Sequence, residues 1–506
     1  MPLVDAPSLS YGRLVANVLA GAAGRAAAIA TALVLSTVLV RTLGLAAYGT
    51  WSFFFVLIGY QGQFDLGLSV AVERAVARAA VAGDRARIDI LLNTGVALTL
   101  GVAVVLQLVA LLPIPDDWLA RIGDPAAVRR CVLVLPFCLA CSNVTAVAGA
   151  GLSGLQRTTT LSAQRSVIGA VTALVVIALA VGGGRLDHLL VAYALGLLST
   201  AGASWRAARR AVGPIAMAPW RANASAVREL AVVGGTLQVT HLAAQAGDQC
   251  LRLILGSTAG SAAIGIYDLA SRAAIVPRSL MAPLLVSLVP FAAAREDRGG
   301  QAALSDTLQR STRYAILAIV VGTTIGLFVA GPFMALWLGV EGRSTMDAQR
   351  ILELMLVALA VQSVTSPMVA LARAAGRPGA EAFATAVAQP LALVAAAQAV
   401  TLVPAVGAYA LVTTLASLIL WWWLKRALGL SGMPARDLVA LALVTAGTTF
   451  GAAAARLSAD AVAAGPWLTL VMVPAGATLA AAAVAIVSGA IPADERRRLA
   501  QIGRGR

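Results

Sequence analysis

The segment from about Leu14 to Val40 constrains this chain most, because it is an apolar run that carries an arginine, Arg25, near its middle. A transmembrane helix needs about 20 apolar residues, so the run is long enough to cross a bilayer. An ionisable side chain near the bilayer centre costs at least ~2.5–3.5 kcal/mol, and it persists where it faces a polar cavity or a charged partner. The run therefore predicts a membrane helix that faces a polar interior.

The composition extends this conclusion to the whole chain. Of its 506 residues, 59% are hydrophobic and 12% are charged, whereas soluble domains are about 45–50% apolar and about 25% charged. Apolar length and flanking polar residues predict an all-α integral membrane protein with about fourteen transmembrane helices. Their approximate ranges are 14–40, 48–70, 88–112, 128–150, 163–182, 187–205, 229–255, 262–292, 312–338, 351–372, 380–402, 405–424, 436–456 and 464–490.

The basic residues indicate how these helices are oriented. A net charge of +15 would suggest a nucleic-acid ligand in a soluble protein. Here the arginines lie mainly in short loops between the predicted spans, and membrane proteins keep such loops in the cytoplasm. With the N-terminus inside, the cytoplasmic loops and tail hold about three times as many Arg and Lys residues as the outer loops. We therefore predict a multi-pass protein of the inner membrane with both termini cytoplasmic and no nucleic-acid partner.

Two pairs of short motifs indicate an internal duplication. Tyr48-Gly49-Thr50-Trp51 opens the second predicted span and Gly265-Ile266-Tyr267-Asp268 opens the eighth, while similar segments end at Arg157 and Arg377. Both pairs need an offset of about 216–220 residues, which predicts two six-helix bundles in parallel orientation. The expected parts are a first bundle, an Arg-rich cytoplasmic linker, a second bundle, two extra transmembrane helices and a basic cytoplasmic tail, at 1–205, 206–228, 229–426, 427–490 and 491–506.

The seventh predicted span carries polar residues at spacings of three and four, which places them on one helix face. They are Gln238, His241, Gln245, Asp248 and Arg252. Such a stripe either lines a cavity or supplies hydrogen bonds between helices. Asp248 and Arg252 are also four residues apart, so they could neutralise each other.

The eighth predicted span has the same form, with Asp268, Arg272 and Arg278 at helical spacing. From a helix start near Ala262, Arg272 lies ~15 Å deep at about 1.5 Å per residue. Asp268 and Arg272 could pair, which would leave Arg278 unmatched. Pro277 and two later prolines suggest a kink in this helix.

Further charged groups fall in the first two spans. Arg25 has no acidic neighbour in its own span, and the candidate ion-pair partners in other helices are Asp65 and Asp248. Asp65 is a candidate ligand of a coupling ion, a partner for an arginine, or a helix-terminus cap. The sequence holds no catalytic motif and no phosphate-cradling glycine loop. With only two histidines, we expect neither an enzyme nor a metal or cofactor site.

Four segments taken in chain order then resemble one family: Leu39–Trp51, Phe64–Ser69, Gly151–Arg157 and Ile264–Arg272. They are similar to segments of the bacterial polysaccharide flippases. These are the O-antigen and exopolysaccharide translocases of the multidrug/oligosaccharidyl-lipid/polysaccharide exporter superfamily. The likeness covers most of the chain, with the expected span count.

The resemblance implies a V-shaped pair of bundles around a cationic cavity. The implied substrate is an undecaprenyl-diphosphate-linked oligosaccharide, moved from the inner to the outer leaflet by alternating access for polysaccharide or lipopolysaccharide biosynthesis. Arg25 and Arg272 resemble the family's cavity arginines, and Arg252 and Arg278 match less closely. Arginine stays charged, and its planar fork suits phosphate oxygens. Membrane lipids, a polysaccharide polymerase and chain-length machinery are the implied partners.

Two other transporters of the same superfamily remain alternatives. One is a flippase for the lipid-linked peptidoglycan precursor, which also uses a basic cavity and fourteen spans. The other is a cation-coupled drug exporter, against which Arg25 and Arg272 argue. A membrane glycan polymerase or ligase would carry a large outer loop, and the longest outer loop expected here, 113–127, is short.

Overall fold

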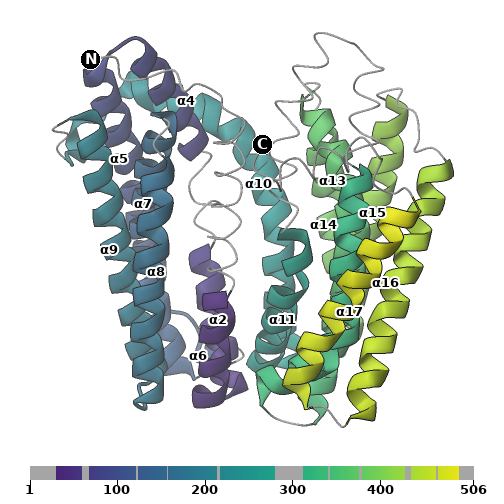
Figure 1. Ribbon diagram of the computed structural model, residues 1–506. Coiled ribbons are helices and arrows are strands. Elements are labelled where there is room, and N and C mark those ends of the chain that lie inside the picture. Colours follow the sequence, from purple (N-terminus) through teal and green to yellow (C-terminus); the bar gives the residue numbers. More distant parts are fainter. Residues whose placement is uncertain are drawn as a thin grey trace. The chain divides into compact units, whose positions relative to one another are not determined.

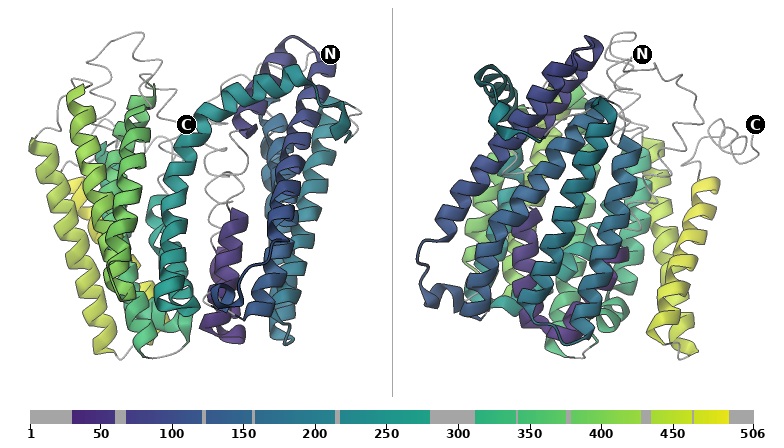
Figure 2. Two further views of the ribbon diagram at one scale, coloured as in Figure 1. Left: turned by 180° about the vertical axis from the view of Figure 1, so that it is seen from behind. Right: turned by 90° about the vertical axis from the view of Figure 1, so that its left-hand side faces the viewer.

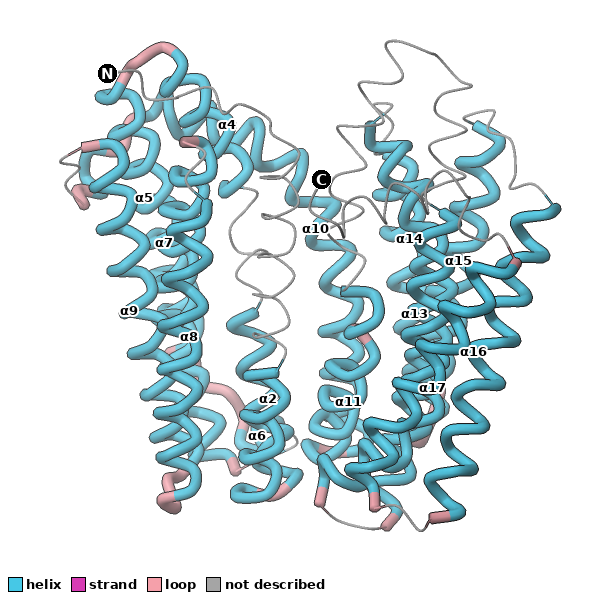
Figure 3. The backbone as a smooth tube through the Cα atoms, in the orientation of Figure 1, coloured by secondary structure: helices cyan, strands magenta, loops and turns pink. Residues whose placement is uncertain are grey.

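The computed structural model describes most of the chain, and the described part is built from helices joined by turns and short loops, without a strand (Figure 3). This confirms the predicted all-α fold class. The chain divides into two compact units, Met1–Asp268 and Leu269–Arg506, and each is considered by itself. The predicted five-part organisation is not tested by this division and stays a prediction. The described residues are 30–59, 68–120, 124–155, 158–213, 217–279, 312–339, 342–374, 379–427, 435–462 and 465–488.

The first unit is a bundle of long helices (Figure 1). A short apolar helix, Ala30–Leu43, precedes them. The elements that follow are α2 (Leu45–Gly59), α4 (Leu68–Val81), α5 (Arg85–Ala110), α6 (Asp116–Ala120), α7 (Pro125–Gly154), α8 (Thr158–Val181), α9 (Leu186–Val212), the 3-10 turn η1 (Pro219–Arg221), α10 (Ala224–Ala259) and α11 (Ser261–Ala274), whose last residues extend into the second unit.

The centre of the first unit is α7, which packs against α2, α4, α5, α8 and α9. Its most apolar window is 56% buried, against 17% for the window Gln164–Val181 in α8. Small residues allow this close packing. A Cβ at Gly151 would lie 2.7 Å from the Leu92 side chain of α5. Because lipid is as apolar as leucine, such van der Waals contact is what holds membrane helices together.

The described residues of the predicted linker, 206–228, are mostly helical. Its first residues continue α9 as far as Val212, and its last residues begin α10. The stretch between them is tied to α5: the Ala218 amide donates to the Asn93 side chain (2.7 Å) and Arg221 pairs with Asp89 (3.4 Å). The linker therefore packs on the first turns of α5, on the side that the sequence predicts to be cytoplasmic.

The second unit continues from α11 with a helix at Thr312–Leu338. It is followed by α13 (Arg343–Ala374), α14 (Gly379–Ala397), α15 (Leu402–Ala427), α16 (Ala435–Ala461) and α17 (Pro466–Val487). After α11 the backbone turns at Ile275 and is helical again over 276–279. Pro277 lacks an amide hydrogen, so it cannot make the helical hydrogen bond at its own position. The predicted kink of this span stays a prediction.

The last two helices, α16 and α17, lie side by side (Figure 2). A Cβ at Gly451 would lie 2.7 Å from the Gly476 carbonyl oxygen, so the two backbones touch. At the start of α16, Asp437 pairs with Arg313 of the helix Thr312–Leu338, and both side chains are 10% exposed. The predicted pair of extra helices therefore docks on Thr312–Leu338 within the second unit.

Ten described helices are long and apolar enough to cross a membrane. They match the third to sixth and the ninth to fourteenth predicted spans. The predicted spans 14–40, 48–70 and 262–292 run partly outside the described residues, and α10 is helical throughout but is not among the ten. The count of fourteen is therefore not confirmed.

Candidate functional site

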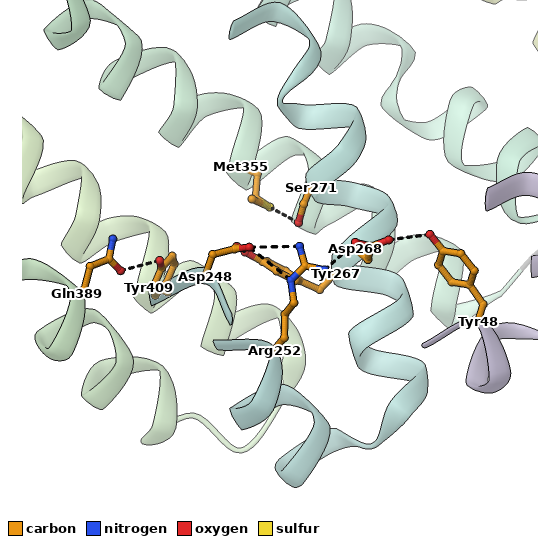
Figure 4. Close-up of polar contacts among 9 residues, drawn as sticks. All are labelled: Tyr48, Asp248, Arg252, Tyr267, Asp268, Ser271, Met355, Gln389 and Tyr409. Carbon is orange, nitrogen blue, oxygen red and sulfur yellow. Dashed lines mark hydrogen bonds and ion pairs between the residues drawn. The ribbon is translucent and has the colours of Figure 1, made fainter. Parts of the chain in front are cut away.

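The best-defined polar site lies where α10 turns back into α11. Gly260 makes this turn with a φ of 81°, a left-handed conformation that glycine adopts without a steric penalty. The turn brings the last part of α10 against the first part of α11. Asp248 and Arg252 of α10 thereby come to face Tyr267 and Asp268 of α11 (Figure 4).

Arg252 is held by a carboxylate on each side. Its Nη1 donates to Oδ1 of Asp268 at 2.6 Å, while its Nε and Nη2 donate to Oδ2 of Asp248 at 3.4 and 3.3 Å. The Tyr267 hydroxyl donates to the other oxygen of Asp248. The guanidinium also lies 5.2 Å from the centre of the Tyr267 ring, which adds a cation–π contribution. We call these residues, together with Tyr48, the Arg252 network.

The network is largely buried. Arg252 is 7% exposed and Asp268 is 1% exposed, whereas the Asp248 side chain is 36% exposed. A buried charge is tolerated only when it is paired and hydrogen-bonded. Of the three charged groups, Asp248 alone is partly open.

The network also ties α2 to α11. The Tyr48 hydroxyl of α2 donates to Oδ2 of Asp268 at 2.7 Å. Beside this hydrogen bond the backbones of α2 and α11 approach each other closely at two glycines. A Cβ at Gly49 would lie 1.8 Å from the Ser261 carbonyl oxygen, and a Cβ at Gly265 would lie 3.0 Å from the Leu45 carbonyl oxygen. Gly49 and Gly265 belong to the two motifs from which the sequence predicts a duplication, and the two glycines meet at this crossing.

Of the predicted substrate-binding arginines, Arg252 is engaged in the network. Its ion pairs give this side chain a structural role, and its substrate-binding role stays a prediction. The predicted pairing of Asp248 with Arg252 is confirmed. Asp268 also pairs with Arg252, at 2.6 Å, a pairing that the sequence did not predict. Arg272 lies half-buried in the last turn of α11, and Arg278 is exposed in the short helical segment that follows.

The other predicted site residues cannot be placed. Arg25 and Asp65 lie outside the described residues. Gln238, His241 and Gln245 lie in α10, but their side chains belong to the part that is not described. The cavity roles of Arg25, Gln238, His241 and Gln245, and the ion-pair, coupling-ion or capping role of Asp65, stay predictions. Among the described residues, no group of three His, Cys, Asp or Glu side chains could hold a metal ion.

Sequence reasoning missed a set of polar contacts within the second unit. The Tyr409 hydroxyl of α15 donates to the Gln389 side chain of α14 at 2.8 Å (Figure 4). The Gln362 amide of α13 donates to Thr413 at 3.2 Å. These residues stand singly in apolar helices, so no spacing pattern marks them. Their contacts are typical of interhelical hydrogen bonds in membrane bundles.

Comparison with known proteins agrees with the sequence and the fold. Residues 14–294 match the family model of the polysaccharide biosynthesis proteins. No curated protein sequence matches the chain significantly. The fold is similar to that of the lipid II flippase MurJ in an inward closed conformation, with a TM-score of 0.68 and 11% identity over 91% of this chain and 96% of that one.

Two further solved structures have the same fold. One is an inward-facing multidrug resistance MATE family transporter of the MOP superfamily, with a TM-score of 0.66 and 14% identity over 79% of this chain and 94% of that one. The other is a MOP superfamily transporter from Pyrococcus furiosus, with a TM-score of 0.52 and 14% identity over 79% of this chain and 95% of that one. At these identities the likeness shows the fold alone. Because the family model covers more than half of the chain, the protein belongs to the polysaccharide biosynthesis protein family and has the fold of the MOP superfamily transporters.

Proposed function

We propose that the protein is a flippase that moves an undecaprenyl-diphosphate-linked oligosaccharide from the inner to the outer leaflet of the cytoplasmic membrane. The observation that carries this proposal is the match to the polysaccharide biosynthesis family over 14–294 in a chain with a MOP transporter fold. A flippase for lipid II shares that fold, so the fold suits a lipid-linked cargo. The diphosphate is anionic, and the proposed cavity supplies cations for it.

In this proposal Arg25 and Arg272 bind the diphosphate. Arg272 follows Asp268 by one turn of α11 and is half-buried. Arg252 itself keeps the neighbouring helices together. The planar guanidinium of each cavity arginine can donate two parallel hydrogen bonds to phosphate oxygens.

Alternating access gives the crossing of α2 and α11 a mechanical role. The glycine contact and the Tyr48–Asp268 hydrogen bond close the end of these helices where α2 begins. Both motifs open predicted spans on the outer side of the membrane. Release of cargo to the outer leaflet then requires this contact to loosen, and cargo binding has to favour that state by its differential affinity.

The direct test is a deletion of the gene followed by extraction and mass analysis of undecaprenyl-linked glycans. Accumulation of a complete oligosaccharide unit, with loss of surface polysaccharide, is the expected result, and the mass identifies the cargo. An unchanged lipid-linked glycan pool with normal surface polysaccharide would refute the proposal.

A second candidate is a flippase of the lipid-linked peptidoglycan precursor. It is favoured by one observation, since the lipid II flippase aligns with 91% of this chain. The same extract separates the two proposals. Depletion of the protein would then cause the peptidoglycan precursor to accumulate, and the cells would lyse.

A further inference from the structure

The second unit has a groove whose lining residues are distant in the sequence from the Arg252 network. It runs between the helix Thr312–Leu338, α13 and α15, and its volume is about 580 Å³. The lining is mostly aliphatic, and the groove is open along one side, since Val357 is 50% exposed and Leu411 is 60% exposed. A sugar would find few hydrogen-bonding groups there, whereas a hydrocarbon chain would find continuous apolar contact.

The length of the groove matches one leaflet of a bilayer. Because α14 returns the chain between them, α13 and α15 run in the same direction. Along α13 the lining extends from Arg350 to Val361, and along α15 it extends from Val403 to Thr414. At about 1.5 Å per residue each stretch is ~16 Å long, about half of the ~30 Å hydrocarbon core. The groove therefore runs from near the starts of these helices to about the middle of the membrane.

The end of the groove near the start of α13 carries one positive and one negative side chain. Arg350 is exposed, and Glu353 is half-buried and accepts a hydrogen bond from Gln349 at 2.8 Å. Residues three apart on a helix lie about 5–6 Å from each other on one face. Among the described residues, Arg350 and Glu353 form no ion pair with each other. Both charges therefore remain available to a ligand at this end.

We propose that the groove binds one acyl chain of a zwitterionic phospholipid with a primary ammonium, such as phosphatidylethanolamine. Its phosphate pairs with Arg350 and its ammonium donates to the Glu353 carboxylate. An anionic headgroup would satisfy Arg350 but would meet the repulsion of Glu353. A quaternary ammonium has no hydrogen to donate, so phosphatidylcholine fits less well. The proposal concerns a lipid of the bilayer and does not depend on the cargo.

The headgroup has to supply most of the selectivity. Lipid tails are as apolar as the side chains of the groove, so an acyl chain gains little by leaving the bilayer for the groove. Hydrogen bonds to charged groups at a partly buried site contribute more than neutral ones. The charged pair should therefore decide which phospholipid binds, and the groove should decide whether one binds at all.

Gly407 of α15 offers a way to fill the groove without disturbing the fold. A Cβ there would meet only the Leu354 side chain, at 3.8 Å, which is ordinary van der Waals contact. Gly407→Phe places a ring in the groove. The matched control is Gly101→Phe on an exposed position of α5, where a Cβ would meet nothing within 4 Å. For the headgroup the test variants are Arg350→Gln and Glu353→Gln. Arg343→Gln, an exposed arginine at the start of the same helix, is their control.

The experiment is native mass spectrometry of the full-length protein, released from detergent after exchange with phosphatidylethanolamine, phosphatidylglycerol or undecaprenyl phosphate. We expect the wild type to retain phosphatidylethanolamine about tenfold better than phosphatidylglycerol, the effect of one charge-assisted hydrogen bond. Gly407→Phe should lose the bound lipid, while Gly101→Phe retains it. Glu353→Gln should abolish the preference, and Arg350→Gln should weaken the binding of both phospholipids.

Three results would overturn the proposal. One is equal retention of both phospholipids by the wild type, and another is retention by Gly407→Phe at the wild-type level. The third is preferential retention of undecaprenyl phosphate, which would assign the groove to the cargo lipid. Because no transport is measured, a failed flippase assay would leave this outcome unaffected.

Discussion

The Arg252 network predicts that its two carboxylates differ in their contribution to stability, although both contact the same guanidinium. Asp268 is 1% exposed and accepts from Arg252 at 2.6 Å and from Tyr48 at 2.7 Å. The Asp248 side chain is 36% exposed, and its contacts with Arg252 measure 3.3–3.4 Å. Removing one partner of a buried ion pair costs about 3–5 kcal/mol, whereas solvent-exposed pairs contribute about 0.2–1 kcal/mol.

We therefore expect Asp268→Asn to destabilise the protein by about 3 kcal/mol. This value is at the lower end of that range, because Arg252 still has Asp248 as an ion-pair partner. Asp248→Asn should cost about 1 kcal/mol or less. With about 2–4 °C per kcal/mol for units of this size, the first change lowers the melting temperature by about 6–12 °C. The assay is thermal unfolding of the detergent-purified protein, followed by tryptophan fluorescence.

Tyr48→Phe is the control for the contribution of the hydroxyl, because it removes one hydrogen bond and leaves the ion pair. It should cost about 1.5 kcal/mol. In a double-mutant cycle, Asp268→Asn and Arg252→Gln should be strongly non-additive, since each removes the same buried pair. Equal destabilisation by the two Asp→Asn changes, or additivity in the cycle, would refute the reasoning from burial.

Three further predictions follow from other contacts. Gly49→Leu should abolish the crossing of α2 and α11, because its Cβ has no room; the yield of folded protein in size-exclusion chromatography checks this, and a normal yield contradicts it. Arg25→Ala and Arg272→Ala should each abolish export of the lipid-linked glycan, and Lys at either site should retain part of the export. Wild-type export by both Ala variants at equal expression would exclude the proposed role of these arginines. Arg313→Met alone should lower the melting temperature, because it leaves Asp437 buried without this partner. The double variant Arg313→Met with Asp437→Leu should recover the wild-type melting temperature. A single variant that melts at the wild-type temperature would contradict the role of the pair.

Much of the fold could be read from the sequence, because the bilayer limits the options. Each spanning segment must be about 20 apolar residues long and must satisfy its own backbone hydrogen bonds, so long apolar runs become helices. The predicted ends were less accurate, as the continuation of α9 beyond residue 205 shows. Alanines and Val212 extend its buried face there, so tertiary packing prolongs the helix across a stretch whose arginines suggested a loop.

The site divides in the same way between local and tertiary information. The sequence by itself indicated that Asp248 could pair with Arg252, because residues four apart on a helix lie on the same face, and the structure has this pair. Gly49 and Gly265 each lie in one of the two similar motifs, but nothing in the sequence indicated that they touch. Only the tertiary structure decided that Asp268 binds Arg252 and Tyr48, since one partner lies across a helical turn and the other lies 220 residues away. Such pairings depend on which helix faces meet, and that is set by packing across the whole unit rather than by spacing within one helix.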